Sequence, residues 1–111
     1  MALPLNVFKT VPCDVPAIGT EIYEAPVGYN AIVLLAQASN TDSVAQYVSL
    51  SFNRNSVATA IVHDFEVPAN EVLTISGGNA GKLILETGDK LILSGTSTDL
   101  KFILSLIETL K

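Results

Sequence analysis

The chain has 111 residues, which fits one domain that can bury a core without disulfides. Charged residues make up only 15% of it, against roughly 25% in an ordinary soluble domain, so we expect a surface that is uncharged or partly covered by a partner. The net charge is −5 and the six Lys and Arg residues are scattered, which argues against nucleic-acid and membrane partners. The single cysteine and the absence of a charged-then-apolar N-terminal segment favour a reducing cell interior.

Prolines mark the first part of the chain, at Pro4, Pro12 and Pro16. Because proline lacks the N–H group that a central strand needs, residues 1–16 are expected to form an extended N-terminal arm. At most a short edge strand is expected in it, over residues 7–11. Such an arm could pair with a neighbouring subunit, and the alternative is a segment packed on its own domain.

The next two segments have the pattern of strands. Residues 20–24 alternate apolar and polar side chains and end at the sequence APVG, where a type I turn would have Pro26 in its second position and Gly28 in its fourth. Residues 30–40 contain the continuous apolar run 31–36, which predicts a strand covered on both faces.

Three more strands are expected in the middle of the chain. In residues 47–53, Val48, Leu50 and Phe52 alternate with polar residues, which predicts one buried and one polar face. The β-branched segment 57–67 and the short segment 72–76 follow. The glycine-rich stretch 77–81 lacks the Lys-Ser/Thr ending and the following helix of a phosphate-binding loop, so it is expected to turn the backbone.

The C-terminal part predicts a hairpin and a last strand. Residues 82–86 and 90–93 flank Thr87-Gly88-Asp89, a three-residue connection with glycine available for a left-handed position. In residues 100–107, Leu100, Phe102, Leu104 and Leu106 share one face, and Ile103 and Ile107 fall on the other. A helix over residues 101–111 is the alternative, because Phe102, Leu106 and Leu110 recur every four residues.

These elements are spaced about 8 to 13 residues apart, as in all-β sandwiches and barrels. The expected fold is therefore a single-domain antiparallel β-sandwich of eight or nine strands over residues 17–111, with a jelly roll as a variant and residues 1–16 as the N-terminal arm.

No arrangement of residues in the sequence indicates a catalytic site. His63 is the only histidine, and its neighbour Asp64 would project to the opposite face of a strand. Cys13 would need His63 as a base to act as a nucleophile. The closest calcium candidates are Glu86 with Asp89, and Asn40 with Asp42; their expected role is to cap backbone groups in turns. We therefore expect no catalytic residue, no metal, no cofactor and no enzymatic activity.

Four segments carry a resemblance to a known class of proteins: IYEAPVG at residues 22–28, FEVPAN at 65–70, KLILETGDKL at 82–91 and LSLIE at 104–108. In this order they resemble small virion structural proteins of tailed bacteriophages, notably those of marine cyanophages. The resemblance covers roughly residues 20 to 109. It implies a non-enzymatic part of the virion, assembled in the host cytoplasm, and it carries no catalytic residues across.

The resemblance and the composition together predict a capsid decoration or cement protein. It is expected to form a homo-oligomer, with a trimer as the guess, and to bind other virion proteins such as the major capsid protein. The expected interface residues are Leu3, Leu5, Val7, Phe8, Val11, Ile103 and Ile107. The alternatives are a neck or tail component, or a β-sandwich module that binds a host receptor or a glycan; the absence of Trp weakens the glycan alternative.

Overall fold

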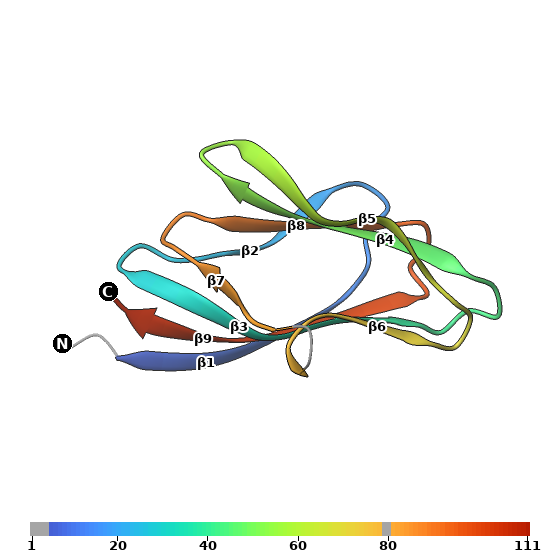
Figure 1. Cartoon of the computed structure of the whole chain (residues 1–111), viewed down its shortest axis with the longest axis horizontal. Helices are drawn as coiled ribbons and strands as arrows, with labels where there is room; N and C mark the ends of the chain where they lie inside the picture. The colour runs from blue at the N-terminus through green and yellow to red at the C-terminus, as the bar shows by residue number, and fades with distance from the viewer. Residues whose placement is uncertain (1–4, 79–80) are drawn as a thin grey trace.

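The computed structural model describes residues 5–78 and 81–111, which fold as a sandwich of two antiparallel sheets (Figure 1). The strands are β1 (Asn6–Asp14), β2 (Thr20–Glu24), β3 (Tyr29–Asn40), β4 (Gln46–Arg54), β5 (Val57–Val67), β6 (Val72–Ser76), β7 (Leu83–Leu85), β8 (Lys90–Gly95) and β9 (Leu100–Leu110). The five-stranded sheet has the order β1-β9-β3-β6, with β7 also paired to β3, and the four-stranded sheet has the order β2-β8-β4-β5. The expected β-sandwich is confirmed.

Strand alternation builds the core between the two sheets. On β9, Phe102, Leu104 and Leu106 are buried, and on β8 and β4 the buried side chains include Leu91, Leu93, Val48 and Leu50. The residues between them point outward, as a period of two requires. The last segment is therefore a strand over its whole length, and the alternative of a helix is wrong.

The expected hairpin of residues 82–93 is also wrong. β7 pairs with β3 in the five-stranded sheet, whereas β8 pairs with β2 and β4 in the four-stranded sheet. The turn itself has the expected geometry, since Gly88 has a φ of 88° and the Asp89 amide donates to the Glu86 carbonyl at 2.9 Å. The turn leads from one sheet to the other, because β7 and β8 do not pair with each other but with strands that are distant in the sequence.

The turn between β2 and β3 lies one residue later than expected. The Tyr29 amide donates to the Pro26 carbonyl at 3.1 Å, so Pro26 is the first residue of the turn and Gly28 the third. Gly28 has a φ of 87°, which a type II turn requires at its third position. This turn also joins the two sheets, because β2 and β3 belong to different ones.

Most of the expected N-terminal arm is an edge strand of the protein's own sheet. β1 pairs with β9 from Asn6 opposite Thr109 to Asp14 opposite Lys101, which is longer than the expected short strand over residues 7–11. Pro12 is tolerated because β1 has no neighbour on its other side. Residues 1–4, and Leu3 with them, lie outside the described residues, and exchange of this segment between subunits stays a prediction.

Candidate interaction surface

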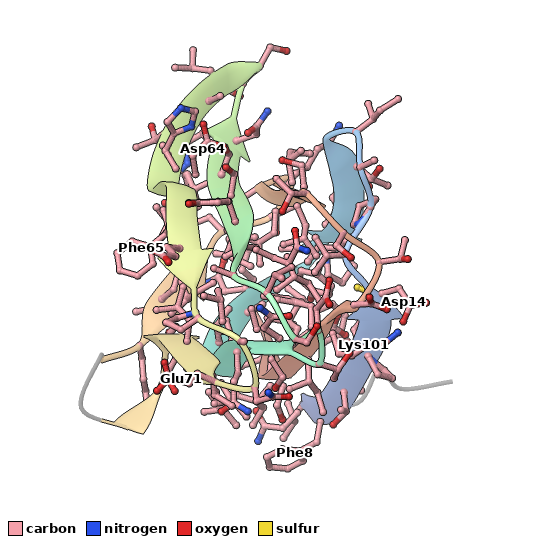
Figure 2. All side chains as sticks on the ribbon, turned by 90° about the vertical axis from the view of Figure 1, so that its right-hand side faces the viewer. Phe8, Asp14, Asp64, Phe65, Glu71 and Lys101 are labelled. Carbon is pink, nitrogen blue, oxygen red and sulfur yellow. The ribbon has the colours of Figure 1, made fainter. Side chains whose placement is uncertain are left out.

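The outer face of the five-stranded sheet carries a row of apolar side chains that crosses four strands. Phe8 on β1 lies opposite Ile107 on β9, Ile107 lies opposite Ile32 on β3, and Ile32 lies opposite Ile84 on β7. Phe8 is 74% exposed and Ile84 is 61% exposed, while the two central isoleucines are partly exposed. We call Phe8, Ile107, Ile32 and Ile84 the apolar row. Figure 2 shows Phe8 pointing away from the body of the sandwich.

The five strands of this sheet contain four charged residues, and they form two pairs. Lys101 Nζ donates to Asp14 Oδ1 at 2.9 Å at one end of the outer face, where Figure 2 shows both side chains. Lys9 Nζ lies 3.3 Å from Glu108 Oε1 on the inner side. The rest of the outer face is apolar or carries uncharged side chains such as Thr10, Ser105 and Gln37. The face therefore presents no isolated charge to a partner.

A buried acid fixes the orientation of β9. Glu108 is 3% exposed, and its Oε2 accepts a hydrogen bond of 2.5 Å from the hydroxyl of Tyr23 on the four-stranded sheet. Burial and this bond raise the pKa of the Tyr23 hydroxyl far above its ordinary value, so the hydroxyl stays protonated and donates. With Glu108 held inward, strand geometry directs its neighbour Ile107 outward.

The outer face of the four-stranded sheet is different. Its corresponding row consists of Glu21 on β2, Ile92 on β8, Ser51 on β4 and Ala60 on β5, which are cross-strand neighbours. Ser49 and Ser94 form the next cross-strand pair on this face. The five-stranded sheet thus has a row made only of large apolar side chains, whereas the corresponding row of the four-stranded sheet includes Glu21 and Ser51.

The residues expected at the interface fall into three groups. Phe8, Ile103 and Ile107 lie on the outer face of the five-stranded sheet, and Leu5, which is exposed, precedes β1. Val7 and Val11 lie opposite Glu108 and Leu104 on the inner side, and Val11 packs against the core. Leu3 lies outside the described residues.

Sequence reasoning missed Ile32 and Ile84. The run 31–36 was expected to be covered on both faces, yet only the inner side chains of β3, such as Ala31 and Val33, are buried within this chain. The partly exposed Ile32 and Leu35 lie opposite the outward Ile107 and Ser105, so they are outward residues of a run whose other side is buried. The available signal for Ile32 was the continuous apolar run 31–36, because such a run in a sheet with one uncovered face places apolar side chains on that face.

His63 and Asp64 do not project to opposite faces, so that expectation is wrong. His63 Nε2 lies 3.4 Å from Asp64 Oδ2, and both side chains are exposed. The alternation fails because Asp64 has a φ of 45° and β5 changes register against β4 there. Cys13 lies on β1, in the other sheet, where burial and then Asp14 raise the pKa of its thiol. A raised pKa keeps the sulfur protonated and weakly nucleophilic.

Among the closest calcium candidates, Asp89 and Asn40 cap backbone groups in turns, as predicted. Asp89 accepts hydrogen bonds from Arg54 Nε at 2.8 Å, Arg54 Nη2 at 2.6 Å and the Glu86 amide at 2.7 Å. The bonds from Arg54 hold the pKa of Asp89 below its usual range. Asn40 accepts from the Asp42 amide at 2.9 Å and donates to the Val44 and Val67 carbonyls. Among residues 5–78 and 81–111, no group of three or more His, Cys, Asp and Glu side chains could hold a metal.

A polar depression of about 480 Å³ lies at the tip of the β4–β5 hairpin. It is lined by Glu21, Glu24, Asn53, Asn55, Ser56, Gly88, Lys90 and Ile92. A glycan site on a sandwich usually places sugar rings on aromatic side chains, and this lining contains none.

The described part of the chain contains no helix long and apolar enough to cross a membrane. No protein-family model matches the chain, and no curated protein is significantly similar to it.

Proposed function

We propose that this protein is a non-enzymatic structural protein of a bacteriophage virion, a decoration protein that works through contacts with other proteins of the capsid. One observation carries the proposal: an uncharged apolar row crosses four strands on an outer face of the sandwich. The resemblance of residues 20 to 109 to small phage virion proteins supplies the setting.

The chemistry of this face is that of a contact surface. Monomeric proteins rarely expose continuous apolar patches larger than a few hundred Å², and such patches commonly mark interaction sites. Burying a fully exposed isoleucine or phenylalanine side chain contributes about 1.5–3 kcal/mol, and the exposed Phe8 and Ile84 have the most to gain when a partner removes them from water. The sandwich below supports this surface with a packed core, so little ordering is needed on binding.

A decoration protein also gains from repetition. Many copies on a regular particle turn individually weak contacts into a lasting attachment, because each copy or oligomer can engage several sites.

The copy number in the particle tests the proposal. Virions of the phage that encodes this chain are purified, and the chain is counted against the major capsid protein by quantitative mass spectrometry. A copy number comparable with that of the major capsid protein supports decoration. A count equal to one or two rings identifies a neck or tail component instead, and absence from the particle removes the virion role.

A glycan array tests the other class of function. The decoration proposal expects no specific hits from the purified protein, in line with the lining of the polar depression. Specific binding to one glycan, abolished by Asn53→Ala or Lys90→Ala in that depression, would favour a receptor-binding module and contradict the proposal.

A further inference from the structure

We infer that a second copy of this chain covers the outer face of the five-stranded sheet, so that two sandwiches pack sheet on sheet around a two-fold axis. This inference rests on the proposed function in that both treat this face as a contact surface. It goes further by naming the occupant.

The dimensions of the face match what a stable dimer needs. β1, β9 and β3 have nine to twelve residues and run for about 30 Å, and the short strands β6 and β7 share the fourth position, along the free side of β3. Four strand positions at a spacing of about 4.8 Å span roughly 20 Å, which gives a face on the order of 600 Å² before the height of the side chains is counted. A standard interface buries about 800 Å² on each partner. This face, with the protruding Phe8 and Ile84, is of that size.

The shape of the face fits a second sheet of the same kind. Two twisted sheets of equal hand pack face to face about 10 Å apart, with their strands within about 30° of each other. A second copy provides a sheet of identical twist and width, and its own apolar row supplies the side chains that fill the gap. Phe8 would be the aromatic anchor and the three isoleucines the stiff surface around it.

Its electrostatics permit burial against an identical face. Asp14 and Lys101 are bonded to each other at 2.9 Å, and they lie at one end of β1 and β9. Covering the face therefore leaves no charge without a partner, which is the costly case in an interface. No excess charge of either sign is present to select a charged protein instead.

A chain with one self-complementary face forms a closed assembly of two copies. In a two-fold dimer the same surface is used by both partners, whereas a three-fold ring needs two different complementary surfaces on each copy. The apolar row is one surface, so the structure favours a dimer over the trimer expected from the sequence. The outer faces of both four-stranded sheets remain in solvent at the two ends of the dimer.

The test measures self-association of the full chain by sedimentation equilibrium. We expect the wild-type protein to have the mass of two chains. Phe8→Lys and Ile84→Lys, at side chains that are already exposed in one chain, should each raise the dimer dissociation constant at least about 100-fold, because a lost side chain counts twice in a two-fold contact. Phe65→Lys, at a phenylalanine that is 50% exposed on β5 of the other sheet, is the matched control and should leave the constant unchanged.

A second measurement does not depend on substitutions. If folding is coupled to association through this face, the wild-type unfolding temperature rises with protein concentration, and the dependence disappears in Phe8→Lys. Circular dichroism establishes that each variant is folded. A monomeric wild-type protein, a trimer, or a dimer that Phe8→Lys and Ile84→Lys leave intact would overturn the inference.

The outcomes separate this inference from the proposed function. A protein that is monomeric in solution and abundant in purified virions refutes the dimer and keeps the decoration role. A dimer that is disrupted as expected, from a chain that is absent from the particle, supports the inference about the face and refutes the decoration role.

Discussion

The two outer faces of the sandwich are made by the same kind of strand and differ in almost every side chain. On the five-stranded sheet, the row across the face reads Phe8, Ile107, Ile32 and Ile84. On the four-stranded sheet, the corresponding row reads Glu21, Ile92, Ser51 and Ala60. Both sheets bury an apolar inner face in the shared core, so folding alone needs neither row to be apolar. The apolar row is therefore better explained by a contact than by the fold.

Making the row across the four-stranded sheet fully apolar should have the largest effect. The triple variant Glu21→Val, Ser51→Val and Ala60→Val would give the protein two apolar faces on opposite sides. Two such faces on one copy allow stacking without closure, as open assemblies require. We expect species much larger than a dimer in sedimentation velocity.

The matched control places threonine at the same three positions. Threonine has the branched shape and strand preference of valine but carries a hydroxyl group, so it should leave the assembly state at that of the wild type. If the threonine variant also forms large species, strand propensity rather than apolar surface drives the association. That result would contradict the claim that the difference in apolar side chains between the two faces decides which face associates.

Stability, in contrast to association, should depend on the inner faces. Tyr23→Phe removes the hydrogen bond to the buried Glu108 and leaves that carboxylate with an unmet acceptor, which should lower the free energy of unfolding by about 1–3 kcal/mol. Chemical denaturation measures the loss. Tyr47→Phe, at an exposed tyrosine on β4, is the control and should change stability by less than about 0.5 kcal/mol.

The ion pair between Arg54 and Asp89 should make the stability of the protein sensitive to acid. The pKa of Asp89 is lowered in the folded chain, so its carboxylate stabilises the fold at pH above the unfolded value of about 3.9, and this contribution is lost as the pH falls through the folded value. We expect the unfolding temperature to fall below about pH 5, and to fall less steeply in Asp89→Asn. Equal slopes for the two proteins would show that other carboxyls carry the acid sensitivity.

Lys9→Met should have the smallest effect. The ammonium of Lys9 lies 3.3 Å from Glu108. Because the Lys9 side chain is half exposed, water weakens the attraction between the two charges. Methionine keeps the apolar stem, so the loss in unfolding free energy should stay at or below about 1 kcal/mol. A loss as large as that of Tyr23→Phe would show that Lys9, and not Tyr23, is the main partner of the buried acid.

The sequence was sufficient for the fold class and for the faces of β4 and β9, because these follow from local alternation. Val48, Leu50 and Phe52 on β4, and the two sides of β9, were read from a period of two and are confirmed. Partner choice between strands was not readable in the same way. The turn at Gly88 has the expected backbone, yet its two strands enter different sheets, because pairing is decided by residues far away in the chain.

The candidate surface could be predicted only in part for the same reason. Phe8 and Ile107 could be assigned to a surface from their own strands, but the row exists only because β1, β9, β3 and β7 are neighbours in this order. Ile84 gives no sign of its role without that order. The contact of His63 with Asp64 depends on a positive φ in the middle of β5, which no local pattern announces.

The pairing of all four charged residues in the five-stranded sheet has a practical consequence. A contact made through its outer face draws little on attraction between ions, so a rise in ionic strength has little to screen. Hydrophobic association weakens on cooling. The dissociation constant of such a contact should therefore change little between dilute buffer and high salt, and it should rise on cooling.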